Sequence, residues 1–236
     1  MKKRIWELDA LRGLCILGMV VVHFVYDLVE LYGLVKWKYP PLFSFVMSWG
    51  GVLFLLISGI SVTLGSRCIR RGLLVFASGL VVSAVTYGMY HFGFARKSLI
   101  IYFGVLHCLG MCMLLWPVFR RLPHWALALL GTALVAGGLY VRTLPGIDFP
   151  WLMPLGLPWK GFASSDYFPL LPYLGFFLLG SALGKSVYRS KESLFPKVNT
   201  ENVIVRFFLL CGKHSLWIYL LHQPVLSAVF YFITMT

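Results

Sequence analysis

Long hydrophobic runs separated by short polar stretches dominate this chain of 236 residues. A run of about 20 apolar residues is long enough to cross the hydrocarbon core of a bilayer as one helix. The pattern predicts seven such helices, over residues 8–31, 42–65, 71–92, 98–119, 124–141, 167–185 and 213–234. We therefore expect an all-α, multi-pass membrane protein with a single domain, residues 1–236.

Two connections between these runs are long. Residues 142–166 form a segment rich in proline and tryptophan, which fits either a functional lid or a plain loop at the membrane interface. Within residues 186–212, the stretch from Glu201 to Leu210 has the pattern of a short amphipathic helix lying on the membrane surface.

Composition and charge agree with a membrane protein, since 59% of the residues are hydrophobic and 12% are charged. Placing the N-terminus in the cytoplasm puts 15 of the 21 Lys and Arg residues on the inner side, which predicts an outer C-terminus. The inner residues are Lys2, Lys3, Arg4, Arg12, Arg67, Arg70, Arg71, Arg120, Arg121, Lys185, Arg189, Lys191, Lys197, Arg206 and Lys213. The net charge of +13 is then explained by topology and anionic lipid, without a nucleic-acid partner. A polyanionic ligand in the cytosol is the alternative explanation.

The first predicted helix contains two ionisable side chains, Arg12 and His23, inside an apolar run, where burial in hydrocarbon is unfavourable for them. Eleven helical steps return to within roughly 20° of the starting direction and rise about 16 Å, so both side chains lie on one stripe. Ionisable groups at membrane depth indicate a functional site. Asp9 lies one turn from Arg12 and is expected to neutralise it. Asp27 lies one turn beyond His23, where it either orients the imidazole or faces water at the outer rim.

Two further predicted helices contain polar residues at depth. His107 lies near the middle of the fourth helix, and Ser215, Tyr219 and His222 form a polar stripe on the seventh. The start of that seventh helix, beside Lys213, is a candidate anion site because its backbone N–H groups are unpaired. One buried histidine is commonly a satisfied core residue, but three in a chain of this length favour a shared site.

The five cysteines indicate neither a disulfide framework nor a metal site. Cys108 and Cys112 are one helical turn apart, but His107 points about 100° away from Cys108. We therefore predict that the chain binds no metal and that these cysteines pack as small apolar residues.

Several motifs resemble those of membrane-bound acyltransferases. The segment Trp6–Gly13 followed by His23 resembles their N-terminal motif, and the Arg-x10-His spacing is that of the acyltransferase type 3 family. The rest is more similar to its relative, the heparan-alpha-glucosaminide N-acetyltransferase-like family of small bacterial membrane proteins. The matching stretches are residues 54–61, 102–107, 174–180 and 212–224.

The resemblance implies acyl transfer from a cytosolic acyl-CoA, usually acetyl-CoA, to a glycan or other acceptor on the far side. It also implies a location in the bacterial inner membrane and importance for Arg12 and His23. Departures exist, because the eukaryotic lysosomal enzyme of this family is longer and has asparagine where His23 aligns.

The residues themselves offer the groups that this chemistry needs. Acyl transfer requires a base, an oxyanion stabiliser and a site for the donor phosphates. His23 is the expected base, with Asp27 orienting it. The candidates for the oxyanion donor are His107, Tyr219 and His222. The candidates for binding the phosphates of coenzyme A are Arg12, Arg67, Arg70, Arg71, Lys213 and Ser215.

Two other functions remain open from the sequence. Buried histidines also relay protons in transporters or flippases of a small anion or lipid, although we find no internal repeat of the kind such proteins show. A seven-helix receptor is a third possibility, weakened for the retinal type by the lack of a lysine in the middle of the last helix. The sequence leaves open which histidine is the base, whether an acyl-histidine forms, and whether the protein is a homodimer.

Overall fold

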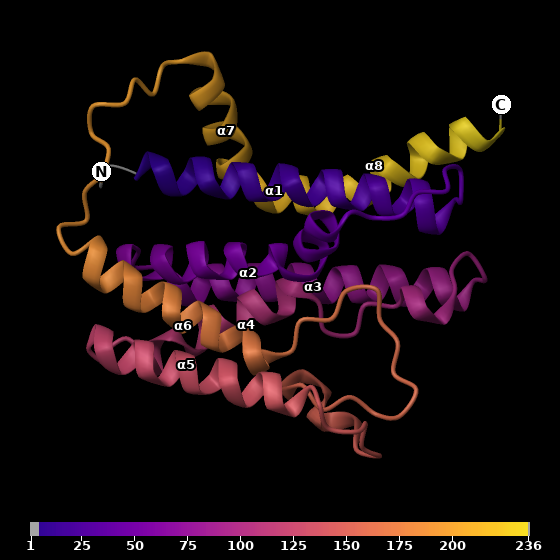
Figure 1. Cartoon of the computed structure of the whole chain (residues 1–236), viewed down its shortest axis with the longest axis horizontal. Helices are drawn as coiled ribbons and strands as arrows, with labels where there is room; N and C mark the ends of the chain where they lie inside the picture. The colour runs from indigo at the N-terminus through magenta and orange to yellow at the C-terminus, as the bar shows by residue number, and fades with distance from the viewer. Residues whose placement is uncertain (1–4, 236) are drawn as a thin grey trace. The chain divides into compact units, whose positions relative to one another are not determined.

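The computed structural model describes residues 5–235, and every regular element in that range is a helix (Figure 1). The predicted inner residues Lys2, Lys3 and Arg4 lie outside it. In chain order the elements are α1 (Trp6–Tyr26), the π-helix η1 (Asp27–Leu31), α2 (Pro41–Leu64), α3 (Cys68–His91), the 3-10 helix η2 (Lys97–Leu99), α4 (Val105–Phe119), α5 (His124–Val141), the 3-10 helix η3 (Pro150–Leu155), α6 (Leu170–Val187), α7 (Val203–Lys213) and α8 (Ser215–Met235).

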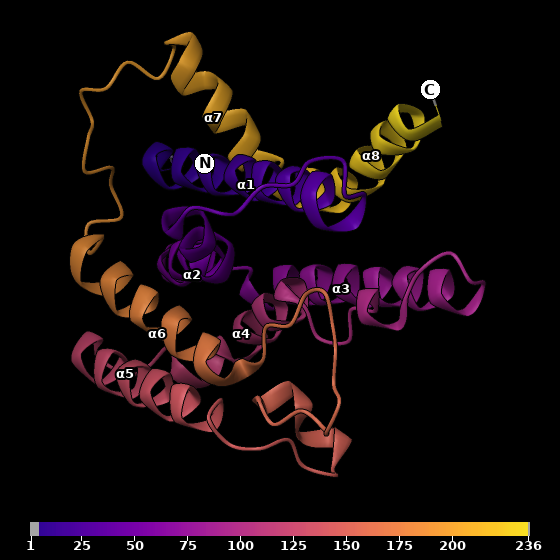
Figure 2. The ribbon, with the colours of Figure 1, turned by 45° about the vertical axis from the view of Figure 1, so that its right-hand side comes forward.

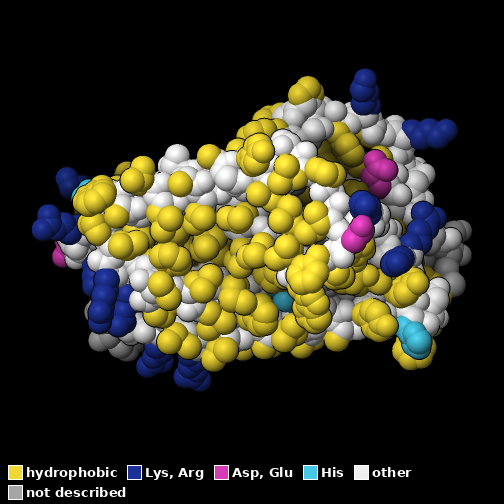
Figure 3. Space-filling model, turned by 90° about the horizontal axis from the view of Figure 1, so that it is seen from below, with side chains coloured by type: hydrophobic (Ala, Val, Ile, Leu, Met, Phe, Trp, Pro, Cys, Tyr) yellow, Lys and Arg dark blue, Asp and Glu magenta, His cyan; other side chains and the backbone are white. Residues whose placement is uncertain are grey.

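Six of these helices are long and apolar enough to cross a membrane, namely α1 with η1, α2, α3, α5, α6 and α8. They coincide with six of the seven predicted runs. Much of their apolar surface is exposed, as on α3, where Leu74 is 60% and Val81 60% accessible. Figure 3 shows one face of the molecule on which hydrophobic side chains predominate and Lys and Arg side chains lie toward the edges. An exposed apolar surface of this extent fits lipid, so the predicted class of multi-pass membrane protein is confirmed.

The remaining predicted run, residues 98–119, is fourth in chain order and differs from the prediction because its helix begins only at Val105. Residues 100–104 are not helical, and side chains distant in sequence bind the backbone on either side of that boundary. Thr86 Oγ1 accepts a hydrogen bond from Ile101 N at 3.1 Å, and Asp166 Oδ2 accepts one from Val105 N at 3.0 Å. The 15 residues of α4 span about 22 Å, less than the roughly 30 Å of a hydrocarbon core.

The extended residues before α4 add to the length of chain that is available for a membrane crossing. Five extended residues add about 16 Å, so the extended stretch and α4 together are long enough for a seventh crossing. We expect an alkaline phosphatase fused after the C-terminus to be active outside the cytoplasm, and a fluorescent protein fused before the N-terminus to fluoresce inside. A C-terminal reporter that is active only in the cytoplasm would contradict seven crossings.

The described chain forms two compact units. Unit one contains residues 5–54 and 191–235, with α1, η1, the first part of α2, α7 and α8. Unit two contains residues 55–190, with the rest of α2 and α3 to α6. Each unit is described separately below, and the expectation of one domain over residues 1–236 stays a prediction.

Unit two is built from helix pairs in close contact. Helices α5 and α6 lie side by side in Figures 1 and 2, and α3 packs on α4. A Cβ atom on Gly175 of α6 would lie 2.6 Å from the carbonyl oxygen of Gly131 on α5, so the two backbones touch there. At the end of α4, Lys185 Nζ donates hydrogen bonds of 2.6 Å to the carbonyl oxygens of Arg120 and Leu122. This predicted inner cation is therefore bound to backbone at a helix C-terminus, where positive charge is favourable.

The two long connections are ordered. In unit two, residues 142–166 contain η3, and Lys160 forms an exposed ion pair with Asp148 at 3.1 Å. In unit one, the predicted amphipathic stretch is helical as α7, although the helix begins two residues later than expected. The side chain of Asn202 caps it by accepting from Ile204 N at 3.0 Å. Its position on a membrane surface stays a prediction.

Candidate functional site

The close crossing of α1 and α7 shapes one end of the site in unit one. A Cβ atom on Gly13 would clash with the carbonyl oxygen of Phe208, and one on Gly212 would clash with that of Asp9. Only glycine permits backbones to approach this closely. The crossing fixes the end of α7 against the turn of α1 that contains Arg12.

This crossing makes a stability prediction with a control on the same helix. Gly13→Ala forces the two backbones apart, so we expect a loss of about 1–3 kcal/mol in stability. A Cβ atom on Gly18 meets no atom within 4 Å. Gly18→Ala is therefore expected to be neutral or slightly stabilising. Thermal unfolding of the two purified variants in detergent measures the difference, and equal midpoints would contradict the tight crossing.

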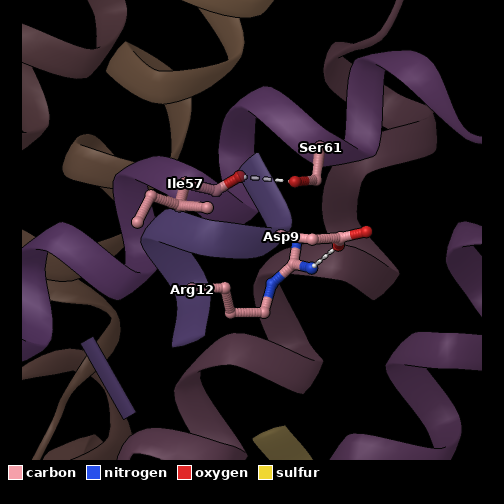
Figure 4. Close-up of polar contacts among 4 residues, drawn as sticks. All are labelled: Asp9, Arg12, Ile57 and Ser61. Carbon is pink, nitrogen blue, oxygen red and sulfur yellow. Dashed lines mark hydrogen bonds and ion pairs between the residues drawn. The ribbon is translucent and has the colours of Figure 1, made fainter. Parts of the chain in front are cut away.

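The cationic end of the site contains Arg12 and the residues that join α7 to α8. Arg12 Nη1 forms an ion pair of 2.8 Å with Asp9 Oδ1, one helical turn away, as the sequence predicts (Figure 4). The side chains of Arg12 and Asp9 keep 19% and 13% of their surface accessible, so this guanidinium can still be reached. Lys213 and Ser215 closely follow the crossing glycine Gly212, and Lys213 is exposed.

The other predicted phosphate ligands belong to unit two. Arg67 directly precedes α3, Arg70 and Arg71 lie in its first turn, and all three are exposed. Positive side chains are unfavourable beside the positive end of a helix dipole, so an anion bound there would relieve their repulsion. Ser61, in one of the motifs that carry the family resemblance, donates a 2.7 Å hydrogen bond to the carbonyl oxygen of Ile57 (Figure 4).

A pair of histidines forms the centre of the site in unit one. The ring centroids of His23 on α1 and His222 on α8 are 4.8 Å apart, with the rings tilted by 59°. The ring of Tyr219 lies 5.4 Å from that of His222 on the same helix. Three of the predicted catalytic residues, from segments nearly 200 positions apart in sequence, are therefore neighbours. The pairing of His23 with His222 is the main geometric feature of the site.

Hydrogen bonding determines which nitrogen of His222 carries the proton. Nδ1 contacts the carbonyl oxygen of Tyr219, which can only accept, so Nδ1 carries the hydrogen. In the neutral ring, Nε2 then holds the lone pair. This atom is buried and has no hydrogen-bond partner among the described residues.

Asp27, predicted to orient His23, is held by a residue to which the sequence reasoning gave no role. The residue Asp27 is 1% accessible, and its Oδ2 accepts a 2.8 Å hydrogen bond from Gln223 Nε2. Asp27 also begins the π-helix η1, directly after the α-helix that contains His23. Such π turns are frequent at functional sites. The signal for Gln223 in the sequence was its place beside His222 in an otherwise apolar run.

His107 belongs to unit two and is held in a network of its own. It is 2% accessible, and its Nδ1 accepts a 3.2 Å hydrogen bond from Gly104 N. Its Nε2 must then carry the hydrogen, and it lies 3.4 Å from Ser83 Oγ. Both ring nitrogens have partners, and the residue lies in the first turn of α4 rather than in mid-helix as predicted. The reason is the late start of that helix.

Hydrogen bonds in unit one also join the first turn of α1 to residues 193–195, and the sequence did not predict them. The buried carboxylate of Glu7 accepts hydrogen bonds of 2.8 Å from Ser193 Oγ and Leu194 N, and Trp6 Nε1 donates to Phe195 O at 3.1 Å. The first turn of α1 thus fixes the connection that leads to α7. The feature of the sequence that could have indicated these bonds is the polar pair Trp6 and Glu7 at the edge of an apolar run.

Comparison with known proteins identifies a family that matches most of the chain. The family described as heparan-alpha-glucosaminide N-acetyltransferase, catalytic, matches residues 4–224, which include both the histidine pair and the cationic end. No curated protein and no solved structure matches the chain.

Proposed function

We propose that this protein, which belongs to the heparan-alpha-glucosaminide N-acetyltransferase catalytic family, transfers an acyl group from acyl-CoA to an amine or hydroxyl of an acceptor. Acetyl-CoA is the expected donor, bound from the cytosolic side. The acceptor is a glycan or other small molecule at the membrane or beyond it. The observation that carries the proposal is the contact of His23 with His222 in the same unit as Arg12 and Lys213.

The proposed chemistry assigns a role to each group at the histidine pair. The nucleophile of the acceptor attacks the thioester carbonyl carbon while His23 takes its proton. The C–S bond then breaks, His23 passes that proton to the departing sulfur, and coenzyme A leaves as the thiol. Tyr219 is the proposed donor to the developing oxyanion. His222 is less suited to this role because its Nε2 carries no hydrogen in the neutral ring, and His107 is engaged within unit two.

The proposed donor site lies at the cationic end. Arg12, Lys213 and Ser215 bind phosphates of coenzyme A. The extended pantetheine arm bridges the roughly 16 Å of helical rise between Arg12 and His23. The ion pair with Asp9 holds the guanidinium in place before the donor binds.

The direct test is transfer by the purified full-length protein. With acetyl-CoA and an amino-sugar probe such as glucosamine, we expect free coenzyme A to be released and an acetylated probe to be found by mass spectrometry. Coenzyme A release that no amine or hydroxyl probe accelerates, with no acetylated product, would overturn the proposal.

The contact between the two histidines also suits a proton relay, which favours a proton-coupled transporter or flippase as the second candidate. This alternative predicts proton flux in vesicles that hold the protein but no acyl-CoA. Acetyl transfer without such proton flux would favour the acyltransferase over the transporter.

A further inference from the structure

Two buried hydrogen-bond acceptors on consecutive residues of α8 remain unexplained by the chemistry above. They are Nε2 of His222 and Oε1 of Gln223, and neither has a hydrogen-bond partner among the described residues. Leaving a buried acceptor unpaired costs about 1–3 kcal/mol. His222 contacts His23, the proposed base, and Gln223 is hydrogen-bonded to Asp27, one helical turn beyond His23.

The identity of each acceptor atom follows from its neighbours. Gln223 must turn its NH2 group toward the carboxylate of Asp27, which accepts at 2.8 Å, so its carbonyl oxygen faces elsewhere. His222 must donate through Nδ1 to the carbonyl oxygen of Tyr219, so its lone pair lies on Nε2. The hydrogen bond to the buried Asp27 keeps the amide of Gln223 in this orientation.

We infer that His222 Nε2 and Gln223 Oε1 form the subsite that binds the acceptor, by accepting hydrogen bonds from two donor groups on it. This inference rests on the proposed function. The two atoms match an acceptor that carries a second N–H or O–H group beside its nucleophile, as polyhydroxylated and amino sugars do. An acceptor with only its nucleophile leaves one atom unpaired. Gln223 is thereby a specificity-determining residue and Asp27 a positioning residue that acts through it.

A matched pair of small amines isolates the second donor. Cyclohexylamine offers only its amine, whereas trans-2-aminocyclohexanol adds one neighbouring hydroxyl. For the wild-type protein we expect kcat/KM for acetyl transfer to be about tenfold higher with the amino alcohol, the value of one net hydrogen bond. In Gln223→Leu this ratio should fall close to one, while His23-dependent transfer to cyclohexylamine continues. A purely structural role of Gln223 would lower both rates and keep the ratio.

Asp27→Leu gives a second, independent variant. This substitution removes the carboxylate that accepts from Gln223 Nε2, so the orientation of the Gln223 amide is no longer fixed. The preference for the amino alcohol should then fall toward one although Gln223 is still present. Ser227→Ala, one turn along α8, is the control and should keep the wild-type ratio.

A measurement that needs no activity completes the test. Nitrogen NMR of 15N-histidine-labelled full-length protein, with the His222→Ala sample to assign the signal, reports the tautomer of His222. We expect hydrogen on Nδ1. Hydrogen on Nε2, or an unchanged preference in Gln223→Leu and Asp27→Leu, would overturn this inference alone. Absence of acetyl transfer from the wild-type protein to both amines would instead overturn the proposed function and this subsite with it.

Discussion

Replacing His23 with alanine is expected to lower the rate of acyl transfer by about two to four orders of magnitude, the usual contribution of a general base. The side chain lies in contact with His222 at the centre of the site and away from Arg12 by about three helical turns. Donor binding should therefore stay close to the wild-type value. Rates from coenzyme A release, together with donor affinity from calorimetry, separate the two effects.

Exposed His124 at the start of α5 provides the control, because His124→Ala removes an imidazole from outside the site. This variant should transfer at the wild-type rate. Near-normal transfer by His23→Ala would remove His23 as the base and leave His222 or His107 as the rival.

Replacing Arg12 with alanine is expected to weaken acetyl-CoA binding by about ten- to a hundredfold. A charge-assisted hydrogen bond to a phosphate is worth about 1.5–3 kcal/mol, and each 1.4 kcal/mol is a factor of ten in affinity. The loss should shrink as salt is raised, since salt screens the attraction in the wild-type protein. Titrations at two ionic strengths measure both quantities.

The matched control for this variant is Arg96→Ala, which removes a cation on the predicted outer side. Its donor affinity should not change. An unchanged affinity in Arg12→Ala at low salt would remove Arg12 from the donor site.

Hydrophobic patterning predicted the helices well because apolar length is a property of each segment by itself. It failed over residues 100–104, where the chain is not helical. The side chains that bind the backbone around this stretch, Thr86 and Asp166, are 15 and 61 positions away from their partners. Such distant hydrogen bonds leave no trace in a local pattern.

Helical spacing also predicted part of the candidate site. It placed Arg12 and His23 on one stripe and Tyr219 and His222 on another, because each stripe lies within a single helix. The contact between His23 and His222 requires two helices to pack in one register, which spacing does not determine. The role of Gln223 depends on the orientation of its amide, which only its bond to Asp27 reveals.

Binding of acetyl-CoA to the purified full-length protein tests the central claim most directly. Calorimetric titration should give saturable binding at one site per chain. Pantetheine, which lacks the phosphates, should bind far more weakly under the same conditions. No saturable binding of acetyl-CoA by correctly folded protein, or equal binding of acetyl-CoA and pantetheine, would contradict the account.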